Sequence, residues 1–194
     1  MKIGEILDIL KDEGIARRFF VMNSFDGILT VLGVLIAMYL FDEKNPNFII
    51  LSCIAPAIAL TISGIWSAYT IERAERKREL GMIEKQMLRS LKETKISRRL
   101  NLLVILNSLI NGISPLIVSV FTISPFLFSL TKLISIKMAF YIAFTIALLI
   151  LFSLGIFVGE IGGFNKLIMG LSMVIIGITI ALIMYILNEY IIVS

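Results

Sequence analysis

The feature that most limits the fold of this chain is a set of five apolar stretches, each long enough to cross a lipid bilayer. A bilayer core about 30 Å thick takes roughly 20 apolar residues in helical conformation. Inside the bilayer the backbone polar groups must find partners within the segment, which an α-helix provides. The stretches cover residues 19–41, 48–71, 100–130, 138–158 and 167–188. We therefore predict an all-α integral membrane protein with five transmembrane helices.

The composition excludes several functional classes. Hydrophobic residues make up 58% of the chain and charged residues 16%, whereas a soluble domain is about 45–50% apolar and about 25% charged. These proportions exclude a soluble enzyme, a disordered chain and a nucleic-acid-binding protein. The chain has no His and one Cys, Cys53, which excludes disulfide frameworks, zinc sites built on His or Cys pairs, and Ser–His or Cys–His catalytic systems. We expect no enzymatic activity and no permanently bound cofactor.

Two charged segments lie outside the apolar stretches. In residues 1–18, Ile3, Leu7 and Leu10 recur at helical spacing opposite charged residues, which predicts an amphipathic helix lying on the membrane surface. Residues 72–99 continue from the second stretch, so we expect that helix to extend out of the membrane as a charged cytoplasmic segment. The predicted organisation is an interfacial helix (1–18), transmembrane helices 1 and 2 (19–71), the cytoplasmic segment (72–99) and transmembrane helices 3 to 5 (100–194).

The distribution of Lys and Arg predicts the orientation of these helices. On one side of the membrane, residues 1–18, residues 72–99 and Lys166 contribute fifteen Lys and Arg residues, and the other side has three. Cytoplasmic segments carry the excess of basic residues. We therefore expect a multi-pass protein of the cytoplasmic membrane, with the N-terminus inside and the C-terminus outside. The net charge of +4 then reflects orientation and contact with anionic lipid headgroups of the bilayer, not binding of nucleic acid.

Asp26 is the most informative polar residue, because it lies inside the first apolar stretch. It is seven residues from Phe19, or roughly 10 Å along a helix. An ionised Asp near the centre of a transmembrane helix costs about 2.5–3.5 kcal/mol, and no Lys or Arg lies within one turn of it. A carboxylate without a fixed counter-ion can bind a proton and a cation in turn. The alternative is that the helix begins near Asp26 and uses it as an N-cap.

Other polar or polarisable side chains are candidates for the same membrane site. They are Met22, Asn23 and Thr30, on or near the helix face of Asp26, and Asn107 and Asn111, one turn apart in the third stretch. We predict that they support ion and proton binding by Asp26. For the two Asn residues of the third stretch, hydrogen bonding between helices is an equal alternative to lining a hydrated path.

The cytoplasmic segment contains a candidate metal-binding stripe. Carboxylates and one thioether fall on one face of the expected helix, at Glu72, Glu75, Glu79 and Met82. Oxygen donors bind divalent ions, and a sulfur donor favours transition metals. The alternative is a solvated face, on which Glu72 and Arg76 form an i, i+4 ion pair worth about 0.2–0.5 kcal/mol.

The same helix also carries an apolar stripe, formed by Leu80, Ile83, Met87 and Leu91. An apolar stripe outside the membrane needs a partner that covers it. The same helix of a second subunit is the first candidate, and the N-terminal amphipathic helix is the competitor.

The segment from Asn23 to Thr30 reads Asn-Ser-Phe-Asp-Gly-Ile-Leu-Thr. It resembles the vacuolar iron transporter family, whose first span opens with an Asp-Gly-hydrophobic-hydrophobic-Thr/Ser motif. Residues 63–69, 112–116 and 166–170 are similar to elements of the second, third and last spans of that family. The chain thus resembles a divergent member of archaeal or bacterial type.

This resemblance implies a homodimer with the topology predicted above. It implies export of ferrous iron from the cytoplasm, with manganese as a second candidate, in exchange for protons. Asp26 would be the ion- and proton-binding group, and Glu72, Glu75 and Glu79 would collect metal at the cytoplasmic mouth.

The chain departs from the family pattern at the end of the second span, where Gly64 and Ala68 replace a Met and a Glu. Two alternatives to metal export therefore stay open. One is transport of a different solute on the same fold. The other is a non-transporting, membrane-anchored interaction protein that docks a partner through its cytoplasmic helix. An intramembrane hydrolase is not favoured, because the chain has no His and no second acid deep in a span.

Overall fold

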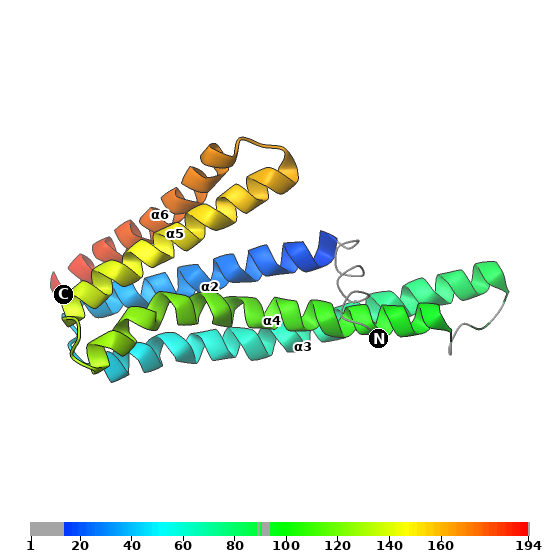
Figure 1. Ribbon diagram of the computed structural model, residues 1–194, viewed down its shortest axis with the longest axis horizontal. Coiled ribbons are helices and arrows are strands. Elements are labelled where there is room, and N and C mark those ends of the chain that lie inside the picture. The colour runs from blue at the N-terminus through cyan, green and yellow to red at the C-terminus, as the bar shows by residue number, and fades with distance from the viewer. Residues whose placement is uncertain (1–13, 89, 91–93, 194) are drawn as a thin grey trace. The chain divides into compact units, whose positions relative to one another are not determined.

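Five α-helices make up the described part of the chain, which covers residues 14–88, 90 and 94–193 of a computed structural model (Figure 1). They are α2 (Gly14–Leu40), α3 (Pro46–Met87), α4 (Lys95–Leu130), α5 (Ile136–Gly162) and α6 (Lys166–Val193). These residues contain no strand, and each of the five helices is long and apolar enough to cross a membrane. For this part of the chain, the prediction of an all-α protein with five helices able to span a membrane is confirmed.

The helices extend beyond the apolar stretches where charged residues adjoin them. α3 continues without a break from the second stretch to Met87, as expected, and α4 is already helical at Lys95. Pro56 in α3 does not end that helix, because an unbroken helix keeps most backbone groups paired in an apolar environment. The amphipathic helix expected for residues 1–18 lies outside the described residues except for its last five, which belong to α2.

The chain divides into two compact units. In its described part, the first unit comprises residues 14–23 and 61–114, and the second comprises residues 24–60 and 115–193. Residues 61–87 of α3 and 95–114 of α4 form the antiparallel helix pair of the first unit, visible in Figure 1 as the long cyan and green helices.

The helices of the first unit touch backbone to backbone. A Cβ atom added to Gly112 would lie 2.6 Å from the carbonyl oxygen of Thr61, and one added to Gly64 would lie 3.1 Å from the Cα atom of Gly112. Small residues permit this close approach between membrane helices. The contact sets the register of α3 against α4, and so decides which of their polar side chains meet.

The second unit has two apolar clusters. One joins residues of α2, α3, α4 and α5, including Leu35, Ile49 and Phe126. The other joins residues of α2, α4 and α5 and adds α6 to them. α5 and α6 form an antiparallel hairpin. α5 ends at its C-cap, Gly163, which has a φ of 68° and whose N–H donates to the Gly159 carbonyl. Glycine is favoured at such a position because it has no Cβ to clash.

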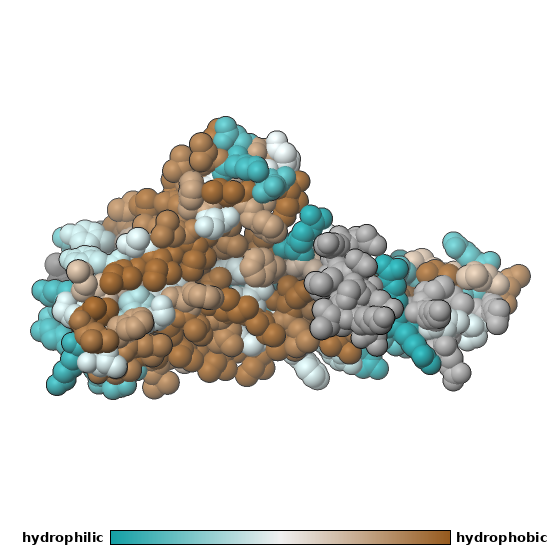
Figure 2. All heavy atoms as spheres, viewed as in Figure 1, coloured by the Kyte–Doolittle hydropathy of each residue, from teal (hydrophilic) through white to brown (hydrophobic). Residues whose placement is uncertain are grey.

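Large apolar side chains are exposed on all five helices. On α6, large residues such as Leu171, Ile175 and Leu182 are exposed, and Figure 2 shows apolar side chains along the helices with hydrophilic ones gathered near their ends. Extended apolar surface of this kind is expected where a protein contacts lipid.

Candidate functional site

Asp26 lies well inside α2, which is already helical at Gly14. The alternative that Asp26 caps the start of a helix is therefore wrong. Its side chain is exposed and makes no hydrogen bond or ion pair with residues 14–88 or 94–193. Thr30, one turn later, donates its hydroxyl hydrogen bond to the backbone carbonyl of Asp26, with 2.7 Å between the oxygen atoms. The carboxylate is thus available to a ligand.

Met22 is exposed on the same helix, one turn before Asp26, with 54% of its surface accessible. Residues four apart on a helix lie on one face. Met22 lies in the part of α2 that belongs to the first unit, and Asp26 lies in the part that belongs to the second. Met22 and Asp26 are the members of the predicted membrane site whose side chains are exposed.

Asn23, in contrast, is engaged in the first unit. Its Nδ2 atom donates to Asn111 Oδ1 and to the backbone carbonyl of Phe19, and Asn111 Nδ2 donates to the carbonyl of Gly64 at 2.7 Å. The amide of Asn111 thereby connects α4 to both α2 and α3. Of the two roles that the sequence left open for Asn111, the structure shows hydrogen bonding between helices.

Asn107, one turn earlier on α4, lies beside a charged residue. It is fully buried, and its Nδ2 donates to Glu72 Oε2 at 3.2 Å. Its Oδ1 is also buried and has no hydrogen-bond partner in the described part of the chain. Asn107 therefore offers one unused oxygen next to a carboxylate.

Glu72 forms the predicted ion pair with Arg76. The Arg76 Nε atom is 3.5 Å from Glu72 Oε2, and the side chains of Glu72 and Arg76 are only 4% and 13% exposed. Arg76 also binds Glu79, with 3.0 Å between Nη1 and Oε2. The solvated-face alternative does not fit Glu72, which is buried between helices.

The remaining members of the predicted stripe, Glu75 and Met82, are exposed. Among the described residues, no group of three or more His, Cys, Asp or Glu side chains is arranged to hold a metal ion. Metal binding by the whole stripe stays a prediction. What the structure brings together is a smaller arrangement of Glu72, Arg76, Glu79 and Asn107.

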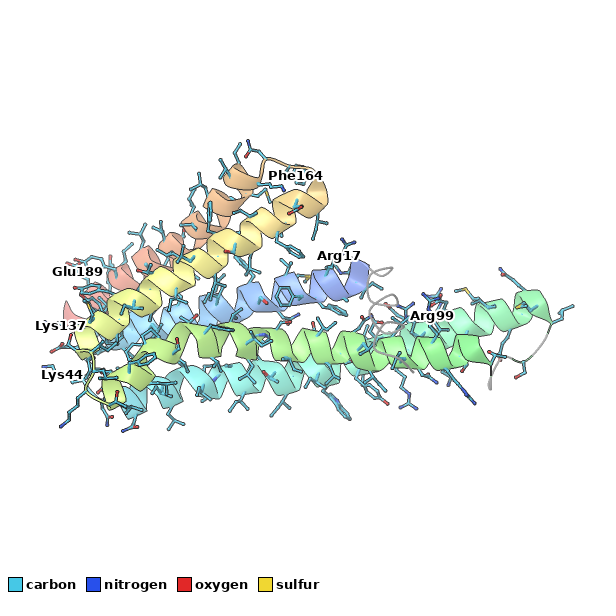
Figure 3. All side chains as sticks on the ribbon, in the orientation of Figure 1. Arg17, Lys44, Arg99, Lys137, Phe164 and Glu189 are labelled. Atoms are coloured by element: carbon cyan, nitrogen blue, oxygen red, sulfur yellow. The ribbon has the colours of Figure 1, made fainter. Side chains whose placement is uncertain are left out.

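A second polar region lies in the second unit, where the loop after α2 meets the start of α5. A cavity of about 560 Å³ is lined there by apolar and polar residues, including Asp42, Lys44, Ser135 and Lys137; the two lysines are labelled in Figure 3. The Nζ atom of Lys44 is 2.8 Å from the Oδ2 atom of Asp42. The hydrogen bond and charge of Lys44 lower the pKa of Asp42, and Asp42 raises the pKa of Lys44. The charges of this region are mixed, so it favours neither anions nor cations.

Sequence reasoning missed two features near these sites. It did not pair Asn107 with Glu72, which are 35 residues apart. It also did not single out Ser24, two residues before Asp26, whose Oγ atom is buried without a hydrogen-bond partner in the described part of the chain. The contact between Asn107 and Glu72 could have been predicted only from the register of α3 and α4. The burial of the Ser24 hydroxyl has no signal in the sequence.

Comparison with known proteins identifies one relative over nearly the whole chain. The uncharacterized protein MJ0645 of Methanocaldococcus jannaschii is 33% identical over 190 residues, which cover 96% of this chain and 95% of the relative. No family model matches the chain, and no solved structure matches it. The chain belongs to the same family as the Methanocaldococcus jannaschii protein.

Proposed function

We propose that this five-helix membrane protein exports a divalent transition-metal ion, Fe²⁺ or Mn²⁺, from the cytoplasm in exchange for protons. The observation that carries the proposal is Asp26, an exposed carboxylate inside an apolar span with no partner in the described residues. Acids inside membranes are rare and costly, and they mark ion and proton pathways. The resemblance of the Asp26–Thr30 motif to the vacuolar iron transporter family supports the same function.

In this mechanism Asp26 binds the ion when ionised and releases it when protonated. Proton and cation compete for one carboxylate, because a nearby positive charge favours its ionised form. Met22 adds a soft donor one turn away, and a thioether favours transition metals over Mg²⁺ or Ca²⁺. Met22 can therefore supply some selectivity although Gly64 replaces the family's methionine in the second span.

We further propose that the protein is a homodimer in which α2 of one subunit faces α2 of the other. An exposed carboxylate on a spanning helix is unfavourable in contact with lipid. A second copy would cover Asp26 and bring two such carboxylates to one ion path. The excess of Lys and Arg in residues 14–18 and 72–99 supports placing these segments on the cytoplasmic side.

The test is metal flux into proteoliposomes under an imposed pH gradient. The wild type should transport Fe²⁺ or Mn²⁺ in a gradient-dependent manner, and Asp26→Asn should abolish this flux. Asp42→Asn is the matched control, because it removes an acid from an exposed loop outside the helices, and it should transport as the wild type does. Wild-type flux with unchanged pH dependence in Asp26→Asn would show that the proposed role is wrong.

Two other outcomes identify the alternatives. A folded wild-type protein that moves neither Fe²⁺, Mn²⁺ nor Zn²⁺ would indicate a different solute on the same fold. A silent Asp26→Asn variant, combined with loss of a cellular phenotype on polar substitution of Leu80 and Ile83, would indicate an anchored interaction protein.

A further inference from the structure

Glu72 is a carboxylate buried where α3 packs against α4. Its side chain is 4% exposed, although it lies just after the apolar stretch that ends at residue 71. A buried carboxylate stays ionised only where a cation or several hydrogen bonds replace the lost water. The groups around Glu72 therefore determine what it can bind.

Arg76 compensates for this charge, but loosely. Its Nε atom is 3.5 Å from Glu72, whereas its Nη1 atom is 3.0 Å from Glu79. Charge-assisted N–H···O bonds are normally about 2.7–2.9 Å long, so the contact with the buried carboxylate is the weaker of the two. Because Glu79 is 43% exposed, the guanidinium can keep that partner in solvent when it leaves Glu72.

Asn107 supplies a second oxygen at the same place. One end of its buried amide donates to Glu72, and the other end, Oδ1, has no hydrogen-bond partner in the described residues. An unpaired buried carbonyl oxygen is unfavourable. Carboxylate and amide oxygens are ligands that divalent cations accept. Because Oδ1 belongs to the amide whose nitrogen contacts Glu72, it is a candidate second ligand for a cation beside that carboxylate.

We infer that Glu72 and Asn107 are ligands of a divalent-cation site that Arg76 occupies as a tethered cation when no ion is bound. An incoming divalent ion displaces the guanidinium from Glu72, and Arg76 stays on Glu79. A guanidinium is always charged, so Arg76 leaves the buried carboxylate only when another cation or a proton takes its place. The inference rests on the proposed function and adds to it a competitor, Arg76, that sets how tightly the ion binds before it reaches the membrane.

The experiment measures Mn²⁺ binding to the full chain in lipid nanodiscs by the electron paramagnetic resonance signal of free Mn²⁺. All variants carry Asp26→Asn, so that the membrane site of the proposed function does not contribute. Arg76→Gln should bind Mn²⁺ about tenfold or more tightly than the Asp26→Asn parent, a coupling of ordinary size. Arg78→Gln, an exposed residue of the same helix, is the matched control for loss of one positive charge.

A second substitution assigns the gain to the site. Adding Glu72→Gln to Arg76→Gln should remove the tighter binding. Equal affinities of Arg76→Gln and Arg78→Gln, or a gain that persists without the Glu72 carboxylate, would overturn the inference. Because these measurements do not depend on Asp26 or on flux, their failure is distinguishable from failure of the transport proposal.

A third variant covers the case in which Arg76→Gln does not fold. Glu79→Gln alters a partly exposed side chain and removes the closer of the two carboxylates that Arg76 contacts, at 3.0 Å against 3.5 Å for Glu72. Mn²⁺ affinity should then fall about fivefold, because the guanidinium stays on Glu72. Glu84→Gln removes another acid of the same helix, outside the predicted stripe, and should change the affinity little; equal effects of the two substitutions would also overturn the inference.

Discussion

Gly27 in α2 lies directly against Pro115 in α4. A Cβ atom added to Gly27 would be 2.6 Å from the Pro115 Cα atom and 2.7 Å from its Cβ atom, and both residues belong to the second unit. Gly27 follows Asp26 in the Asp26–Thr30 motif. The glycine of this motif therefore has a packing role: it lets α4 approach α2 beside the acid.

Gly27→Ala should lower the stability of the protein. The added methyl group meets backbone atoms of Pro115, which cannot move aside as a flexible side chain can, so overpacking should cost about 1–3 kcal/mol. Thermal unfolding in detergent measures the effect.

Gly33→Ala is the control in the same helix, because its Cβ atom would meet only Ile180, at 4.0 Å. Alanine favours a helix over glycine by up to about 1 kcal/mol, so Gly33→Ala should be neutral or stabilising. Equal destabilisation by both variants would contradict the packing role.

The spans were predictable because membrane helices are identified by a local property, the length of an apolar stretch. The stretch at 138–158 lies inside α5 and the one at 167–188 inside α6. The helix ends were less predictable. α3 runs sixteen residues past its apolar stretch to Met87. The absence of Gly and Pro just after that stretch predicted the extension, but no residue pattern predicted where the helix ends.

The partners inside the candidate sites were not predictable to the same extent. The Glu72–Arg76 pair was predicted, because both residues lie on one helix at i, i+4 spacing. The contact of Glu72 with Asn107 depends on how α3 and α4 are aligned, and that alignment follows from the Gly64–Gly112 contact. Asp26 could be placed inside a span from the sequence, but an all-round apolar helix does not reveal which of its faces is exposed.

Asn111→Ala should destabilise the first unit. The substitution removes the hydrogen bonds that connect α4 to Asn23 of α2 and to the Gly64 carbonyl of α3. Hydrogen bonds between membrane helices contribute about 0.6 kcal/mol on average and up to about 1.7 kcal/mol, so a loss of about 1–2 kcal/mol is expected from two of them. Asn101→Ala, at an exposed position of the same helix, should change the unfolding free energy by less than about 0.5 kcal/mol. The same small change in Asn111→Ala would show that these bonds contribute nothing.

The Asp42–Lys44 pair should give the protein a pH-dependent contribution to stability. Asp42 has its pKa lowered from 3.8 by Lys44, and Lys44 has its pKa raised from 10.5 by Asp42. A lowered acid pKa stabilises the fold above the unfolded value, and this stabilisation is lost as pH falls through the folded pKa. A raised Lys pKa stabilises the fold below pH 10.5, and this stabilisation is lost as the pH rises through the pKa of Lys44 in the folded protein.

Lys44→Met should therefore lower the unfolding temperature slightly between about pH 4 and pH 10, and the difference from the wild type should shrink outside that window. Because both groups are exposed, high salt should also reduce the difference. Lys132→Met, in another exposed loop, is the control for loss of one positive charge. A difference that persists below the folded pKa of Asp42 would mean that Lys44 acts through something other than this acid.

Glu72 and Arg76 should be strongly coupled in stability when divalent ions are removed by a chelator. Arg76→Leu leaves a buried carboxylate without its cation, and removing one member of a buried ion pair costs about 3–5 kcal/mol; with Arg76 13% exposed, a value near the low end is expected. Glu72→Gln should cost less, because Arg76 keeps Glu79 and Asn107 keeps an oxygen acceptor.

The double variant Glu72→Gln/Arg76→Leu should be more stable than the sum of the single effects implies, with a coupling of about 1–3 kcal/mol. Chemical unfolding of the four proteins in one detergent measures this cycle, and Arg78→Leu, an exposed position on the same helix, should lie within about 0.5 kcal/mol of the wild type. Strictly additive effects would show that Arg76 does not neutralise Glu72, and the tethered-cation site would then lose its physical basis. The coupling should shrink when Mn²⁺ is added if the ion takes over the role of the guanidinium. A ligand that binds only the folded state stabilises it, and Mn²⁺ should stabilise Arg76→Leu most, because that variant keeps Glu72 and has lost its cation.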